Sequence, residues 1–397
     1  MYKSVDEKRI IWQAFPLFLV GLTLRPLTSA VGPVLPEIRA EFGMSATTAS
    51  LLSTLPVIAF GLGAFYVPRI LHRITPNHAM GIALLIIFAG AHLRIIPNEL
   101  ALFLGTIVLG LGVAIGNVVP SIIARRDYSK NVGMVMGLVV GGISLAPAIA
   151  AQITYPLTQL FSSWRWAMYA WAILPFFVWL SWRRYVRDHQ SNVVLDTPHS
   201  MKAMLRNPLA WALVIYFGFQ STNFYSLGSW LPSILRESGM NPTVAGYQLA
   251  VMLFIGFPAG LLVPPLATKF KSQVWLCVLF VLIFAIGLVG IYVFSTTGWW
   301  PAGTWLWSTL LGIGLGSSFP LALTLVLLRT DNQETARDLS SFMQGIGYII
   351  SALGPLVLGA IRDTTNSWNM AYGALAIALT VQLIAGIIVS RPVIIAR

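Results

Sequence analysis

Apolar residues fill the chain in long runs, which polar and charged residues interrupt at intervals. Stretches without any charge recur at 42–68, 131–164, 207–235, 238–268, 272–328 and 364–390. An α-helix needs roughly 20 apolar residues to cross the hydrocarbon core of a bilayer. Each run is long enough for one crossing, and the run 272–328 fits two crossings around the turn STTGWWPAG. The pattern therefore predicts an all-α integral membrane protein that crosses the bilayer many times.

Twelve transmembrane helices account for this pattern. We expect them at 10–34, 46–67, 77–96, 100–124, 132–155, 164–184, 208–235, 244–266, 272–294, 302–328, 337–361 and 367–390. No small-residue cleavage site follows the first apolar run, so no cleavable signal peptide is predicted. Cys277 is the single cysteine, which excludes an internal disulfide. No spacing typical of a metal or haem site occurs, and we expect no metal and no cofactor.

The charges agree with a membrane protein. Of the 397 residues 10% are charged, whereas soluble domains carry about 25%. A net charge of +12 would suit a nucleic-acid partner, but membrane topology explains it better. With the N-terminus inside, 19 of the 25 Lys and Arg residues fall in inner segments and five in outer loops, as the positive-inside rule requires. We therefore expect both termini in the cytoplasm and no nucleic-acid partner.

An internal repeat divides the chain into two halves. LPEIRAEFGM at 35–44 and LPSILRESGM at 231–240 match at six positions with an offset of 196, and Gly32 likewise matches Gly228. The longest polar stretch between spans lies at 185–207. We expect an N-terminal six-helix half at 1–184, a cytoplasmic linker at 185–207 and a C-terminal six-helix half at 208–397. Duplicated six-helix halves resemble the major facilitator superfamily, whose two pseudo-symmetric bundles rock about a site near the bilayer midplane.

Arg25 is the one charge inside the first predicted span. An arginine at this depth costs about 2.5–3.5 kcal/mol on insertion scales, so it should face a polar cavity or a partner. Pro26 disfavours helix at Arg25 and removes a backbone donor. None of the thirteen acids falls within the core of a span, so a substrate anion is the counter-ion that we expect. The alternative is a structural arginine that bonds to carbonyls freed by the proline or snorkels outward.

Neutral polar side chains within the spans complete the candidate site. The repeat maps Arg25 onto Ser221, so the second half lacks a matching arginine. Each neutral residue either binds substrate or hydrogen-bonds a neighbouring helix. One charge with several neutral donors suits a small monoanion or a polar molecule with a partly negative edge. Arg94 is expected at the membrane interface. The predicted substrate-binding residues are Arg25, Asn117, Gln220, Asn223, Gln344 and Tyr348.

Several segments resemble a particular family, the bacterial cyanate and 2-nitroimidazole transporters. The segments are LRPLTSAVGPVLPEIR (24–39), VPSIIARRD (119–127), FYSLGSWLP (224–232), GLGSSFPLAL (314–323) and FMQGIGYIISALGP (342–355). The resemblance implies a secondary transporter of the bacterial inner membrane that works by alternating access. Its substrate would be cyanate, with Arg25 as the central anion-binding charge. The alternative is an exporter of nitroimidazole-like or other small polar aromatic compounds.

Other classes of function fit the sequence less well. The five histidines are scattered, and no acid–base pair, nucleophile triad or metal cluster typical of an enzyme is found. A channel or a sensor is also less favoured, because duplicated halves and broken helices are typical of alternating access. No carboxylate in the core of a span can relay protons, which leaves uniport, exchange, symport of a protonated substrate, or a minor role for His92 as the relay. We expect a monomer with a small-molecule substrate and membrane lipids as its partners.

Overall fold

The computed structural model describes residues 2–71, 73–129, 131–188 and 202–394, and helices dominate them. No strand occurs among these described residues. The elements are α1 (Tyr2–Leu24), α2 (Pro26–Ser29), α3 (Val31–Phe42), α4 (Ala46–Leu71), α5 (Pro76–Leu93), α6 (Glu99–Asp127), α7 (Val132–Phe161), α8 (Trp164–Ala172), α9 (Leu174–Asp188), α10 (Lys202–Leu205), α11 (Pro208–Glu237), α12 (Pro242–Ala267), α13 (Val274–Thr297), η1 (Pro301–Gly303), α14 (Thr304–Leu328), α15 (Gln333–Thr365) and α16 (Asn369–Val389).

The all-α fold with twelve membrane helices is confirmed. Ten helices in the described part of the chain are long and apolar enough to cross a membrane, and α1, α2 and α3 together form the first of them, Trp12–Phe42. The other two predicted spans are α8 with α9, and α11. The first is broken at Ile173 into two shorter helices, and the polar run 220–223 lowers the mean hydropathy of the second. Both are nevertheless helical.

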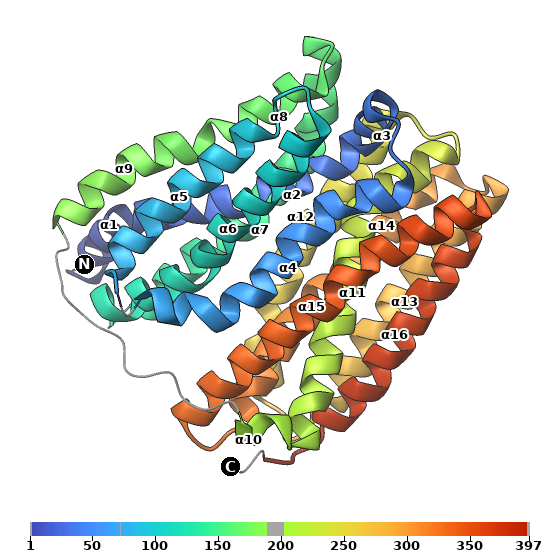
Figure 1. Ribbon diagram of the computed structural model, residues 1–397. Coiled ribbons are helices and arrows are strands. Elements are labelled where there is room, and N and C mark those ends of the chain that lie inside the picture. Colours follow the sequence, from blue (N-terminus) through green and yellow to red (C-terminus); the bar gives the residue numbers. More distant parts are fainter. Residues whose placement is uncertain (1, 72, 130, 189–201, 395–397) are drawn as a thin grey trace.

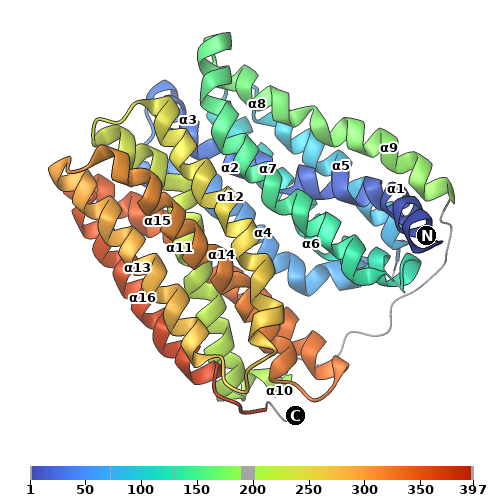
Figure 2. The same ribbon diagram turned by 180° about the vertical axis from the view of Figure 1, so that it is seen from behind.

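The helices form two groups that follow the order of the sequence. Helices of the first half, blue to green, pack together, and those of the second half, yellow-green to red, form the other group (Figures 1 and 2). The predicted linker at 185–207 begins within α9 and contains α10, while residues 189–201 of it lie outside the described residues. The start of α1 and the end of α16 lie where the two groups diverge, which we call the terminal end. The opposite end carries the turns at 43–45 and 366–368 and is called the closed end.

The predicted repeat recurs in the backbone conformation. Gly43 ends α3 with a φ of 63°, and Gly239 follows α11 with a φ of 89°. Glycine adopts such angles at low cost and commonly ends helices in this way. The amide of Met44 donates to the carbonyl of Arg39, and the amide of Met240 donates to the carbonyl of Leu235, each at 3.0 Å. Donors and acceptors are thus related by the same offset of 196.

Repeat-related elements also meet across the interface between the halves. α4 packs on α15, and α12 packs on α7. α4 and α7 are the second and fifth spans, and α12 and α15 are the eighth and eleventh spans. The repeat relates the second span to the eighth and the fifth to the eleventh, so the two pairs are equivalent. Gly32 and Gly228 lie against each other, since a Cβ atom built on Gly32 would be 2.5 Å from the Gly228 carbonyl oxygen. A pseudo-two-fold axis therefore relates the two bundles and passes between α3 and α11.

Candidate substrate-binding site

Arg25 occupies a break in the first membrane span, as the sequence predicts. α1 ends at Leu24 and α2 begins at Pro26. The Arg25 carbonyl accepts hydrogen bonds from the amides of Thr28 and Ser29 at 3.1 Å and from the Thr28 hydroxyl at 2.7 Å. The next turn therefore satisfies this carbonyl locally. No described backbone carbonyl accepts from the Arg25 guanidinium, which disfavours the purely structural role.

The guanidinium reaches from the first half to the second. Its Nη1 donates to the hydroxyl of Tyr225 at 2.8 Å. Its Cζ lies 5.5 Å from the centroid of the Phe60 ring on α4, a distance at which a cation is attracted to the ring face. Its Nε is buried and has no hydrogen-bond partner among the described residues. No described carboxylate forms an ion pair with Arg25, so its positive charge remains uncompensated.

Tyr348 joins Arg25 in an aromatic enclosure. Its ring centroid lies 6.0 Å from that of Phe60, 5.1 Å from that of Phe217 and 6.4 Å from that of Tyr225, all edge to face. The Tyr348 hydroxyl is close enough to interact with the charge of Arg25. We call Arg25, Phe60, Phe217, Tyr225 and Tyr348 the Arg25 cluster. It presents one cation and two hydroxyls among flat apolar faces, a combination suited to a planar solute with negative charge.

Asn117 lies near the level of Arg25, and Gln344 lies one helical turn from Tyr348. Gly116 packs directly on the side chain of Leu24, which brings the adjacent Asn117 to the level of Arg25. The Asn117 side chain is half-buried, and no described residue hydrogen-bonds to it. Gln344 lies one turn from Tyr348 toward the terminal end and donates to the hydroxyl of Ser340 at 3.0 Å. Their positions are compatible with the substrate contacts predicted for them.

Gln220 and Asn223 are not brought to Arg25. At 3.6 residues per turn they lie roughly 140° and 160° around α11 from Tyr225, which faces Arg25. Gln220 donates to the hydroxyl of Ser221 at 2.8 Å, and both amide atoms of Asn223 are buried without a described partner. Tyr216 shares their face of α11 and bonds to α14. The two amides therefore belong to a polar layer within the second half, and their contact with substrate stays a prediction.

Three residues of the Arg25 cluster were absent from the predicted set: Phe60, Phe217 and Tyr225. A signal for Tyr225 exists in the repeat. Ser221 is the equivalent of Arg25, and Tyr225 lies one helical turn beyond Ser221 on the same face of α11. Because the halves face each other across a pseudo-two-fold axis, that face points toward Arg25. Phe60 and Phe217 carry no such signal, since phenylalanine is frequent throughout the apolar spans.

A second arginine supports the helix break. Arg94, which we expect at the membrane interface, is buried within the protein with 2% of its surface exposed. Its Nη1 donates to the carbonyl of Leu27 in α2 at 2.7 Å. A charged donor satisfies a carbonyl close to the break and fixes the short helix beside Arg25. Its Nε and Nη2 have no described partner, so this region of the first half carries a second uncompensated positive charge.

Hydrogen bonds join the two halves from the closed end down to Arg25. The Asp363 carboxylate accepts from the amides of Ala46 and Thr47 at 2.7 Å and from the Thr47 hydroxyl at 2.6 Å. Arg236 pairs with Glu37 at 2.7 and 3.0 Å. At 1.5 Å per helical residue, Arg25 lies roughly 25 Å from the closed-end turn. The bond from Arg25 to Tyr225 therefore joins the halves far from the closed end.

Known proteins that resemble this chain in sequence are membrane transporters. The chain matches the Major Facilitator Superfamily over residues 17–355. It is 33% identical over 379 residues to the uncharacterized transporter YycB of Bacillus subtilis (strain 168), covering 94% of this chain and 92% of that protein. It is 34% identical over 358 residues to the cyanate transport protein CynX of Escherichia coli (strain K12), covering 89% and 91%. It is 29% identical over 394 residues to the 2-nitroimidazole transporter of the same organism, covering 98% of each.

The fold is also that of a solved transporter. The crystal structure of a D-xylose-proton symporter superposes on this chain with a TM-score of 0.73, covering 96% of this chain and 98% of the other. The two sequences are 15% identical. At this identity the likeness concerns the arrangement of the helices, and the side chains at the centre of the bundle are this chain's own.

Proposed function

The chain belongs to the Major Facilitator Superfamily, and from this premise we propose that it transports a small planar solute that carries negative charge, with cyanate as the first candidate. It is a multi-pass secondary transporter, not an enzyme. The specific substrate is the part that we propose. The supporting observation is the uncompensated guanidinium of Arg25, which hydrogen-bonds across the contact between the two halves.

The chemistry of the Arg25 cluster favours a monoanion. Tyr225 accepts a hydrogen bond from Arg25, so its own hydroxyl proton is free to donate to an anion beside the guanidinium. The buried Nε of Arg25 can donate to the same anion. Hydrogen bonds to a charged group contribute about 1.5–3 kcal/mol each. Cyanate is linear and accepts at both of its ends, and a single guanidinium balances its single charge.

The location of the cluster also suits alternating access. Arg25 and Phe60 belong to the first half, whereas Phe217, Tyr225 and Tyr348 belong to the second. An anion held by Arg25 and Tyr225 together would bind both halves and would follow them as they rock. We propose that the described conformation opens toward the terminal end, where the two groups of helices diverge.

A second candidate is a nitroaromatic compound. The nitro group spreads negative charge over two oxygens, which match the planar fork of a guanidinium. The rings of Phe60, Phe217 and Tyr348 would then pack on the aromatic ring of the solute. The relative named 2-nitroimidazole transporter supports this candidate, as CynX supports cyanate.

The orientation and setting of the protein are further parts of the proposal. We propose that both termini face the cytoplasm of a bacterial inner membrane and that a monomer suffices for transport. The support for the orientation is the 19-to-five distribution of Lys and Arg between inner and outer segments. We also propose that residues 185–207 link the halves on the cytoplasmic side.

Counterflow in proteoliposomes tests the function. Vesicles loaded with unlabelled cyanate, formate, nitrite, bicarbonate or 2-nitroimidazole are diluted into labelled cyanate. We expect a transient accumulation of label with cyanate inside, and likewise with any other internal solute that the same site transports. A channel would give no counterflow, and the absence of counterflow with every solute of the panel would contradict the proposal.

A further inference from the structure

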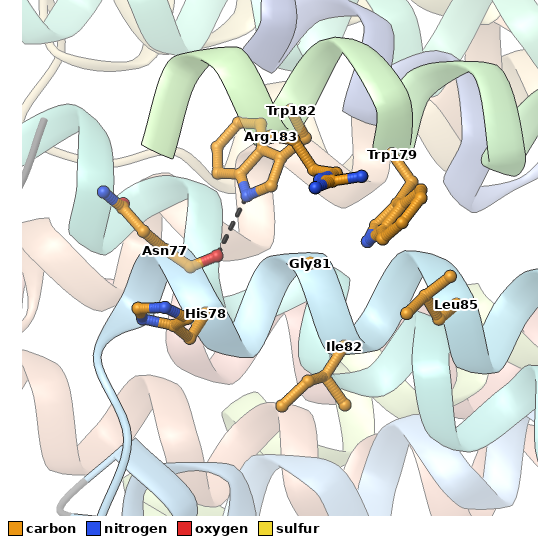
Figure 3. A pocket seen from close by; sticks show the side chains of 8 residues that line it. All are labelled: Asn77, His78, Gly81, Ile82, Leu85, Trp179, Trp182 and Arg183. Carbon is orange, nitrogen blue, oxygen red and sulfur yellow. Dashed lines mark hydrogen bonds between the residues drawn. The ribbon is translucent and has the colours of Figure 1, made fainter. Parts of the chain in front are cut away.

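A groove runs along the outside of the first half, away from the Arg25 cluster. It lies between α5 and α9, and Figure 3 shows its walls. Both helices lie on the side of the first half that faces away from the second half (Figures 1 and 2). The groove therefore opens toward the surrounding membrane and not toward the contact between the halves. It encloses about 280 Å³, near the lower limit of the roughly 300–1,000 Å³ typical of small-molecule sites.

The groove changes from charged to apolar along its length. His78 lies in the first turn of α5 and Arg183 lies near the end of α9, both close to the terminal end, and both side chains are exposed. Ile82 and Leu85 continue the groove one and two turns further along α5. They are 44% and 38% exposed. An exposed cation at the terminal end is thus followed by exposed apolar side chains.

The walls of the groove are fixed before any ligand binds. The Trp182 indole nitrogen donates to the Asn77 carbonyl at 2.9 Å, and this side chain is 1% exposed (Figure 3). Gly81 forms the floor, since a Cβ atom there would be 3.6 Å from the Trp182 ring. Arg183 lies with its Cζ 5.1 Å from the centroid of the Trp179 ring. No described acid pairs with Arg183, so its fork of donors faces the groove without a counter-ion.

We propose that this groove binds an anionic phospholipid, with the phosphate on Arg183 and the start of an acyl chain on Ile82 and Leu85. Arginine binds phosphate through two parallel hydrogen bonds. Tryptophan favours the level of the headgroups. Anionic lipids attract basic residues at the cytoplasmic surface, and most of the cations of this chain are predicted on that side. The small volume fits a headgroup better than an entire lipid.

The repeat supplies an internal comparison for the charge. Shifted by 196 residues, His78 corresponds to Val274 and Ile82 to Val278. Val274 and Val278 line a second groove at the equivalent place on α13. That groove has no cation along its described lining. Selectivity for anionic lipid should therefore come from the first groove alone, and Arg183 is its source.

Thermal unfolding of the purified full chain, titrated with lipid in detergent, tests this proposal. We expect phosphatidylglycerol to raise Tm more than phosphatidylcholine does. Arg183→Gln should raise the phosphatidylglycerol concentration that gives half of the maximal Tm increase at least fivefold. Arg184→Gln, which removes an exposed arginine outside the groove, should leave this concentration unchanged. Gly81→Leu fills the groove but keeps Arg183, and it should raise this concentration as well.

Three results would overturn the proposal. Equal losses in Arg183→Gln and Arg184→Gln would mean diffuse attraction to surface charge. Full phosphatidylglycerol stabilisation in both Arg183→Gln and Gly81→Leu would mean that the groove is not the site. Equal stabilisation by glycerol phosphate would mean a free-phosphate site without a lipid. None of these outcomes depends on counterflow, so the experiment tests the lipid site independently of the transported substrate.

Discussion

Arg25 and Tyr225 lie 200 residues apart and share a 2.8 Å hydrogen bond that joins the two halves of the molecule. The donor is a permanent cation and the acceptor is a neutral hydroxyl. A neutral partner leaves the charge of Arg25 free to attract an anion, whereas a carboxylate in its place would compete with one. The pair thus joins the two halves and leaves the positive charge of Arg25 without a described counter-ion.

Removing the Tyr225 hydroxyl should weaken anion binding. Tyr225→Phe keeps the ring and deletes one donor to the anion. A hydrogen bond to a charged group contributes about 1.5–3 kcal/mol, so Kd should rise roughly 10- to 150-fold. Isothermal titration with cyanate measures the change. Tyr247→Phe is the matched control, because no described residue hydrogen-bonds to the Tyr247 hydroxyl. Equal effects of both variants, or none in Tyr225→Phe, would remove Tyr225 from the site.

Asp363 should stabilise the contact between α4 and α15 at the closed end. Its carboxylate accepts three hydrogen bonds from the first turn of α4, which belongs to the other half. Asp363→Asn keeps the size of the side chain but removes the charge that the helix N-terminus attracts. Charge-assisted bonds contribute about 1.5–3 kcal/mol. We therefore expect about tenfold more frequent opening between α4 and α15.

A cysteine reporter measures this opening. Ser50 is buried on α4 between Thr47 and Thr54, two residues that contact α15. Ser50→Cys is close to isosteric, and the native Cys277 is buried. The rate of maleimide labelling at position 50 should rise about tenfold with Asp363→Asn. Asp331→Asn changes an exposed acid at the other end and should have no effect. Unchanged labelling in Asp363→Asn would mean that the carboxylate does not hold the closed end.

A single methyl group should disturb the contact between α3 and α11. In Gly32→Ala the new Cβ would lie 2.5 Å from the Gly228 carbonyl oxygen, so the backbones must separate. Overpacking of this kind costs about 1–3 kcal/mol. Gly228→Ala is the matched control, because no atom lies within 4 Å of a Cβ built there. Labelling of Ser50→Cys should increase in the first variant only. Equal labelling in the two variants would contradict the close approach.

The acids of the closed end should not relay protons. Glu41 accepts from the Trp164 indole nitrogen at 2.6 Å and pairs with Arg165, both in the first half. Glu37 pairs with Arg236. Both carboxylates thus have structural partners far from Arg25. We expect Glu41→Gln and Glu37→Gln to retain any pH-driven uptake in proteoliposomes. Loss of that uptake with intact exchange, in either variant, would identify a proton relay.

The sequence predicts the fold well because its signals are local. Apolar runs predict the spans, and the matching segments at 35–44 and 231–240 predict the two-fold arrangement down to the turns at Gly43 and Gly239. Arg25 stands out because a charge in an apolar run needs a partner. Each of these inferences uses only neighbouring residues or a fixed offset. The helix break at Pro26 follows in the same way.

The site is harder to predict because it depends on which way each helix faces. Gln220 and Asn223 are polar and close in sequence to Ser221, but α11 turns them away from Arg25. Phe60 comes from α4, and its position beside Arg25 follows from packing between distant segments. Arg94 is buried because a carbonyl of α2 offers it a partner, a pairing that only the folded chain creates.

Equilibrium binding of cyanate to Arg25 variants is the most direct test of the central claim. Arg25→Gln removes the charge and should abolish measurable binding, and Arg25→Lys should weaken it at least tenfold because an ammonium lacks the planar fork. Circular dichroism and Tm verify that each variant is folded. For any other solute that competes with cyanate, the unchanged protein should likewise bind more tightly than Arg25→Lys, and Arg25→Lys more tightly than Arg25→Gln. A folded Arg25→Gln protein that binds these solutes with unchanged Kd would contradict the account.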